Sequence, residues 1–377
     1  MTSAGKACLL AALAAVLLPA TSIRGEGVNV SGSLYVDDFV MSDKSARDSS
    51  LSGITHEIGL KVDLDVRENL SFSGKLCYGC HGLEIDRAYL DFTPRSWINV
   101  QAGRIPVPFG DFALRTDPGS HRTSSKPLIY EMGRMVHYGT NAFNLGVQPL
   151  PYVDTGVLVY GQTWLGKQLQ VWYGAYGVSG LKGQNDIDYA ALRSIYYNDN
   201  NRVPSAGGRV VASYSSSSAS ATFKDATVGA SAMYGRYDPN LKLAYRALGV
   251  DASLRVGPLV LRGEAALRRT DIDPTVPGYR FQIIDPFIDK SGFYVEAEHR
   301  LGSRLQVVYR LDGLRRRGVP LPGSDPKLSP DSTILRYTQG LQFTITDAFY
   351  SKLEYEYWWL NDFNSFHAGH FGIGGLF

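Results

Sequence analysis

Three features are scarce in this 377-residue sequence: cysteine, net charge and long apolar runs. Of the three cysteines, Cys8 lies in an N-terminal apolar run that we expect to be removed, which leaves Cys77 and Cys80. A formal net charge of +2 implies no nucleic-acid partner. No later stretch is long and apolar enough for a transmembrane helix, so the chain could span a membrane only as a closed barrel with every backbone group paired.

The residues that are abundant fit such a barrel. From Gly27 to Phe377, apolar and polar side chains alternate in segments of about ten residues, the pattern of a transmembrane β-strand with one face toward lipid. In the segment 305–311, Leu305, Val307 and Tyr309 share one face, while Gln306 and Arg310 share the other. The 40 glycines, 23 tyrosines and 16 phenylalanines suit strands that end in aromatic girdles. The alternative is a soluble β-sandwich.

The N-terminus has the pattern of a secretory signal. Lys6 precedes an apolar run that is too short to cross a bilayer as a helix, and the small residues Ala20 and Ser22 follow it. We therefore expect residues 1–22 to be a signal peptide. No linker or composition shift divides the remainder, so residues 23–377 are predicted to form one outer-membrane β-barrel of a Gram-negative bacterium, in contact with outer-membrane lipids.

Turn signals give the number of strands. Seven short turns, among them 224–225, 257–258 and 302–303, alternate with eight longer connections, of which 107–151 is the longest. This count predicts an all-β fold, a transmembrane antiparallel β-barrel of about 16 strands, wide enough to leave an aqueous channel. The last strand ends at Phe377, and a terminal Phe on an alternating strand resembles the recognition signal of outer-membrane assembly machinery.

The start of the longest connection carries a family resemblance. The residues Gly103-Arg104-Ile105-Pro106-Val107-Pro108-Phe109-Gly110 resemble the Gly-Arg-Phe-Lys-x-Pro-Phe-Gly stretch of the phosphate-selective porin (type O and P) family, and the barrel layout resembles that family over nearly the whole mature chain. The resemblance implies a passive porin, a homotrimer, and a third loop, 107–151, that folds into the lumen as the constriction. The charged loop residues expected at that constriction are Asp111, Arg115, Asp117, Arg122, Lys126, Glu131 and Arg134.

Charges of both signs are predicted on the lumen side of the strands. Those singled out are Arg262, Arg268, Arg310, Glu296 and Glu298. In anion-selective members of the family that this chain resembles, the inward-facing residues form a ladder of basic side chains. A wall with charges of both signs instead passes small hydrophilic solutes and hinders apolar ones. The alternative role of these charges is to brace the wall as ion pairs. No nucleophile motif is recognisable, so we expect no enzyme.

One short motif does not belong to a porin. Cys77-Tyr78-Gly79-Cys80-His81 matches Cys-x-x-Cys-His, in which two thiols bond haem c and the histidine, here His81, ligates the iron. The same thiols could instead form a local disulfide in an oxidising compartment. Flanking strand patterns at 70–76 and 83–92 favour the disulfide hairpin without a cofactor. The alternative function is a haem-bearing electron-transfer porin, similar to the cytochrome–porin fusions of some iron-oxidising bacteria.

Overall fold

The computed structural model describes thirteen stretches of the chain. They are residues 27–42, 53–79, 82–115, 117–130, 135–138, 141–144, 146–149, 152–183, 199–216, 222–273, 285–318, 331–362 and 364–377. The predicted signal peptide, residues 1–22, lies outside them. Among these residues, no helix has the length and apolar character needed to cross a bilayer.

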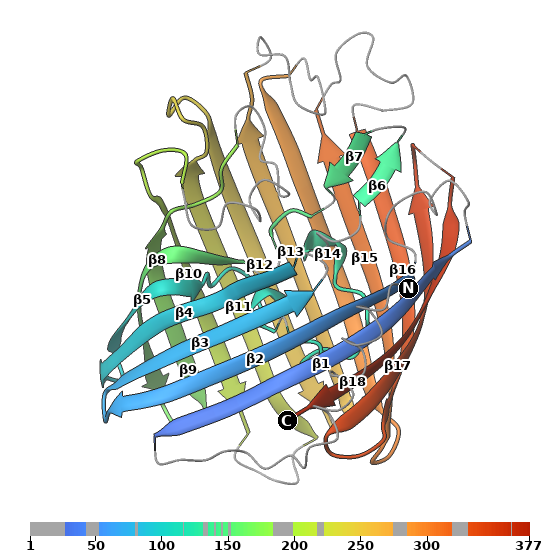
Figure 1. The fold of residues 1–377 in the computed structure, drawn as a ribbon, viewed down its shortest axis with the longest axis horizontal. Helices are drawn as coiled ribbons and strands as arrows, with labels where there is room; N and C mark the ends of the chain where they lie inside the picture. Colours follow the sequence, from blue (N-terminus) through green and yellow to red (C-terminus); the bar gives the residue numbers. More distant parts are fainter. Residues whose placement is uncertain are drawn as a thin grey trace, which may run out of the picture.

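Sixteen antiparallel strands form a closed barrel, as the sequence predicts (Figure 1). The strands are β1 Val28–Met41, β2 Gly53–Arg67, β3 Leu70–Gly79, β4 Gly82–Arg95, β5 Ile98–Pro106, β8 Val153–Leu165, β9 Leu169–Val178, β10 Ser205–Ser215, β11 Phe223–Arg236, β12 Ala244–Val256, β13 Leu259–Asp271, β14 Phe287–Arg300, β15 Leu305–Arg317, β16 Asp331–Thr344, β17 Phe349–Leu360 and β18 Phe366–Leu376. A separate hairpin of β6 (Met135–Tyr138) and β7 (Asn141–Asn144) lies between β5 and β8 in the chain.

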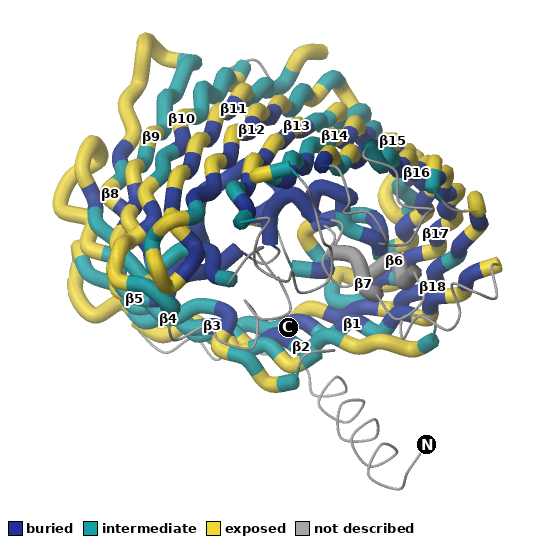
Figure 2. The backbone as a smooth tube through the Cα atoms, turned by 90° about the horizontal axis from the view of Figure 1, so that it is seen from above, coloured by how far each residue is buried: buried dark blue, intermediate teal, exposed yellow. Residues whose placement is uncertain are grey.

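The alternation of side chains determines which face of each strand looks inward. Along β17, Leu353, Tyr355 and Tyr357 are exposed on the outside, whereas Glu354 and Glu356 between them are buried inside. Figure 2 shows the same alternation of buried and exposed positions around the ring. An apolar exterior and a polar interior are the arrangement that lipid outside and water inside require.

The first and last strands close the barrel. Nine residue pairs join β1 to β18, from Ser33 opposite Leu376 to Met41 opposite Ala368. Beyond β18, Gly32 and Phe377 exchange two backbone hydrogen bonds of 2.8 and 3.1 Å. The ring of Phe377 occupies the space that a Cβ on Gly32 would need, so this glycine permits the close approach. The C-terminal residue is therefore part of the closure.

The predicted turn at residues 224–225 is wrong. Residues 224–225 lie inside β11, which begins at Phe223, rather than between two strands. The ladder to β12 continues past them, with a register irregularity between Phe223 and Asp225. Asp225 also forms a 3.4 Å ion pair with Arg255 of β12, and this cross-strand pair favours the extension of the strand.

Candidate functional site

In the connection between β5 and β8, residues 107–115 and 117–130 lie inside the barrel (Figure 2). Its short 3-10 helices, η1 Phe112–Leu114 and η2 Leu128–Tyr130, are mostly buried. The ring of Phe109 packs so closely on Gly249 of β12 that a Cβ there would be crowded, and Ile129 packs in the same way on Gly292 of β14. The apolar core of the molecule is thus between this internal segment and the strands it covers.

Three carboxylates of the wall hold the backbone of the internal segment. They are Glu264 on β13, Asp312 on β15 and Glu354 on β17, all buried. The donors are the backbone N–H groups of Phe112 to Glu264 (3.3 Å), Leu128 to Asp312 (3.0 Å), Ser124 to Glu354 (2.7 Å) and Ser125 to Glu354 (3.3 Å). Because a buried N–H without an acceptor is costly, these carboxylates make the internal path of the segment possible.

Basic side chains of the wall satisfy the carbonyl groups of the same segment. Arg310 donates to Thr123 Oγ1 (2.7 Å) and to the carbonyl of Ser125 (3.2 Å). Lys352 donates to the carbonyls of Pro118 (2.7 Å) and Thr123 (3.0 Å). Hydrogen bonds to charged groups are stronger than those between neutral groups. The segment is therefore held both through its backbone N–H groups and through its carbonyl groups.

The anchoring charges also form a continuous buried network. Arg310 contacts Glu296 (3.3 Å) and Asp312 (3.0 Å), and Arg336 contacts Asp312 (3.2 Å) and Glu356 (3.1 Å). These side chains have almost no exposure to solvent. A buried pair is costly to break, because the partner that remains is a charge without compensation. The network therefore braces the wall and does not line a water-filled space.

A second group of charges keeps partial exposure inside the barrel. Arg122 of the internal segment and Arg262 of β13 are partly exposed, and they lie 3.8 and 3.4 Å from Glu298 on β14, which is itself buried. Lys126 lies 4.0 Å from Glu57 of β2, with both side chains more than a quarter exposed. Because inward-facing side chains can be exposed only to space within the barrel, these residues mark where water reaches the interior.

The remaining sequence-predicted residues divide between these two environments. Asp111 and Arg115 pair with each other at 2.9 Å. Asp117 forms an ion pair with Lys75 of β3, across the barrel from the β13–β17 wall. Arg268 is buried and donates to the carbonyl of Val147 (2.8 Å). Glu131 and Arg134 lie outside the described residues.

Two loop groups have displaced pKa values. Burial raises the pKa of Asp117, but the charge of Lys75 and its hydrogen bond outweigh that effect and hold the pKa below its usual value. His121 is fully buried, and burial together with the charges of Lys352 and Lys126 puts its pKa well below its ordinary value. We conclude that Asp117 is ionised and that His121 is neutral near pH 7.

The structure describes only part of the Cys-x-x-Cys-His motif. Cys77 is on an inward-facing position of β3, where its thiol lies 3.9 Å from Glu57 Oε1. Cys80 and His81 lie outside the described residues. The ladder pairs Tyr78 with Leu83 and Gly79 with Gly82, so strand pairing continues to both sides of the undescribed pair.

Sequence reasoning did not single out two buried residues of the wall, Lys352 and His370. Lys352 has the same parity on β17 as Glu354 and Glu356, and His370 has the inward parity of β18. Alternation could therefore have placed both residues inside the barrel. It could not have shown which loop atoms they meet, because the partners of Lys352 are about 230 residues away in sequence.

Solved outer-membrane proteins have the same fold. An anion-selective porin from Comamonas acidovorans matches with a TM-score of 0.60 at 13% identity, over 93% of this chain and 99% of that chain. OmpF of Salmonella typhi, in complex with daunomycin, gives 0.56 at 11% identity over 93% and 97%. The trimer form of Vibrio cholerae OmpT gives 0.51 at 9% identity over 93% and 99%. No family model and no curated protein matches the sequence.

Proposed function

We propose that this protein is an outer-membrane porin, a passive diffusion channel for small hydrophilic solutes or ions that is narrowed by loop 107–151. The observation that carries the proposal is the path of this loop through the barrel, where Glu264, Asp312 and Glu354 hold its backbone. A loop fixed at three points on the inner wall narrows the lumen permanently. It therefore sets the size of the solutes that pass.

The exposed charges favour a general pore over one specific for phosphate. Arg122 and Arg262 share Glu298, and Lys126 faces Glu57, so each group of interior charges contains both signs. Adjacent opposite charges attract polar solutes without a strong preference for anions or cations. The resemblance to phosphate-selective porins thus extends in this proposal to the barrel and its third loop, and not to selectivity.

The proposed place of action is the outer membrane of a Gram-negative bacterium, with lipids around the apolar exterior. OmpT of Vibrio cholerae, which shares the fold, is an outer-membrane protein, and one of its structures is a trimer form. We extend the outer-membrane location and a homotrimeric assembly to this chain as part of the proposal. No nucleophile constellation in the sequence supports catalysis, and none is proposed.

Single-channel recording tests the proposal. The purified, heat-modifiable barrel should insert into a planar bilayer and give ohmic conductance steps that scale with bulk KCl conductivity. In proteoliposomes, small sugars should enter faster than large ones. A properly folded barrel that produces no steps and admits no sugar contradicts the porin function.

For the Cys-x-x-Cys-His motif we propose a disulfide between Cys77 and Cys80 and no bound haem. Supporting this, Cys77 lies within β3, just after a register irregularity between Lys75 and Leu76, and the pairing of Gly79 with Gly82 leaves only two residues for the connection. Haem attachment of this type usually opens a helical turn, which a strand hairpin does not offer. Intact-mass measurement should show a loss of two hydrogens, whereas an added haem mass on the peptide that contains Tyr78 would establish the electron-transfer alternative.

A further inference from the structure

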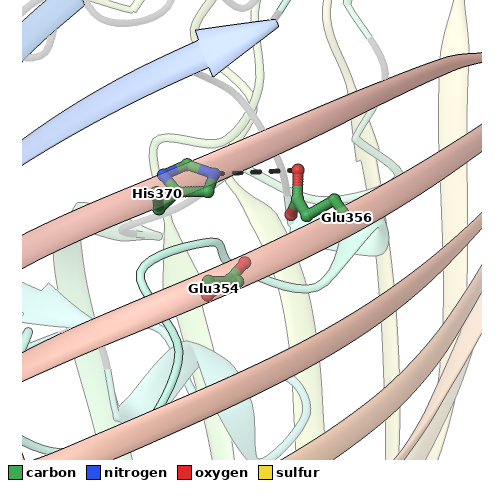
Figure 3. A group of neighbouring side chains, drawn as sticks. All are labelled: Glu354, Glu356 and His370. Atoms are coloured by element: carbon green, nitrogen blue, oxygen red, sulfur yellow. Dashed lines mark ion pairs between the residues drawn. The ribbon is translucent and has the colours of Figure 1, made fainter. Parts of the chain in front are cut away.

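Two glutamates and a histidine meet on the inner wall (Figure 3). Glu354 and Glu356 are two positions apart on β17 and so share its inward face. His370 of β18 is directly opposite Glu354 in the strand ladder. One ligand atom from each residue lies within 4.8 Å of the others, and all three residues are buried.

The imidazole of His370 is oriented by a carboxylate on the far side. Its Nδ1 lies 2.7 Å from Asp37 Oδ2 of β1. A proton on Nδ1 that is donated to Asp37 leaves the lone pair on Nε2, which lies 3.7 Å from Glu356 Oε2. That distance is too long for a hydrogen bond. A carboxylate behind the histidine and further oxygens in front of it are typical of metal-binding histidines.

Both glutamates are also held in place by other groups. Glu356 is paired with Arg336 (3.1 Å) and accepts a hydrogen bond from Trp358 Nε1 (2.9 Å). Glu354 accepts the backbone N–H groups of Ser124 and Ser125. Carboxylate ligands of metals are usually oriented by such outer hydrogen bonds. The three candidate ligands are therefore fixed before any ion arrives.

Spacing and charge are both compatible with a cation. In a tetrahedral site with metal–ligand bonds of about 2.0–2.2 Å, neighbouring ligand atoms are about 3.3–3.6 Å apart. The distance from His370 Nε2 to Glu356 Oε2 is close to this at 3.7 Å, and all three candidate atoms lie within 4.8 Å of one another. Among the described side chains of this buried network, five carboxylates face three basic side chains. The carboxylates are those of Asp37, Glu296, Asp312, Glu354 and Glu356, and the basic residues are Arg310, Arg336 and Lys352. This local excess of carboxylates favours the binding of a cation.

We propose that Glu354, Glu356 and His370 bind one divalent transition-metal ion of the Zn²⁺ class. An imidazole with two carboxylates suits Zn²⁺ and related ions better than Mg²⁺ or Ca²⁺, which prefer ligand sets made of oxygen alone. Since Glu354 also holds Ser124 and Ser125, the ion fixes the same glutamate that anchors the internal loop. Metal binding thus stabilises the docked position of the loop.

Metal binding by the full mature chain tests this site. The barrel, purified in detergent and stripped with a chelator, should bind one Zn²⁺ per chain when Zn²⁺ is added alone. Co²⁺ in its place should give the visible absorption bands of a tetrahedral site with one imidazole ligand. A wild-type protein that retains its heat-modifiable fold but binds no Zn²⁺ and shows no Co²⁺ bands overturns the proposal, and His370 is then only a hydrogen-bonded partner of Asp37.

Variants assign the ligands. His370→Ala should lose the Zn²⁺ and the Co²⁺ bands, while His367→Ala should keep both, because His367 is exposed on the outer face of the same strand. Asp37→Asn preserves the ligands but weakens the orientation of His370, so Zn²⁺ affinity should fall by about 10- to 100-fold. Equal Zn²⁺ affinity in the wild type and in a folded His370→Ala variant would contradict the assignment. If His370→Ala does not fold, unchanged affinity in folded Asp37→Asn contradicts it.

Discussion

At the scale of single residues, the inward-facing charges have two different environments. Arg310, Asp312 and Arg336 are completely buried and hold the loop or one another. Arg122 and Lys126 keep more than a quarter of their side-chain surface exposed. Exposure inside the barrel therefore separates charges that act on stability from charges that can act on solutes.

The buried network predicts a large stability effect for Asp312→Asn. The substitution leaves Arg310 and Arg336 without their shared carboxylate, and breaking a buried pair in this way costs about 3–5 kcal/mol. Thermal unfolding, followed by heat modifiability, should occur at a clearly lower temperature. The control is Asp331→Asn on β16, whose pair with Arg315 is exposed and should matter little. Equal unfolding temperatures for the two variants would refute the bracing role.

The exposed charges predict an effect on selectivity. Arg122→Glu should shift the reversal potential in a KCl gradient toward cation preference, because it reverses a partly exposed charge beside Glu298. Arg246→Gln is the control, since Arg246 is exposed on the outer face of β12. A reversal potential unaffected by Arg122→Glu would place this residue away from the path of the ions.

His121 predicts a dependence of stability on pH. Burial lowers its pKa in the folded protein, and the facing cations Lys352, Lys126 and Arg115 lower it further. The unfolded chain takes up a proton on this residue as the pH falls through about 6.5, whereas the folded chain does not. The stability of the docked loop is therefore greatest above that pH and declines below it. Between pH 7 and 5, the unfolding temperature should fall more steeply in the wild type than in His121→Asn, and parallel slopes would argue against the assignment.

At the scale of elements, alternation predicts strands well and their partners poorly. The period of two places Glu354 and Arg310 on inner faces because that depends only on neighbouring residues. Arg310 meets Thr123 across 187 positions of sequence, and such a contact depends on the register of several strands and on the path of the loop. The wrong prediction of a turn at 224–225 has a similar cause, because pairing with β12 determines whether these residues form a turn or a strand.

The closing strand predicts a depth-dependent effect on assembly. Phe371 is more than half exposed in the middle of β18, so Phe371→Arg should cost about 2–4 kcal/mol if this position is near the bilayer midplane. His367→Arg is the control near the end of the same strand, where an outward charge costs about 0–1 kcal/mol. Refolding yield of the heat-modifiable barrel measures both. Equal yields would mean that the outer face of β18 does not contact lipid.

At the scale of the whole molecule, the barrel and its internal loop form one unit. The connection between β5 and β8 contributes much of the buried apolar core, and strands from β3 to β17 bond to it. Under the proposed porin function, stability and permeability depend on the same segment. A lumen emptied of this loop would be wider, and it would also expose carboxylates and guanidinium groups that now bond to the loop.

The most direct test of the account is the single-channel conductance of a barrel in which residues 117–134 are replaced by a short Gly-Ser linker. The control replaces residues 184–198, in the segment that joins β9 to β10, with the same linker. We predict a clearly larger conductance for the first variant and an unchanged conductance for the second. Equal conductance of the wild type and a properly folded 117–134 variant would contradict the claim that the internal loop forms the constriction.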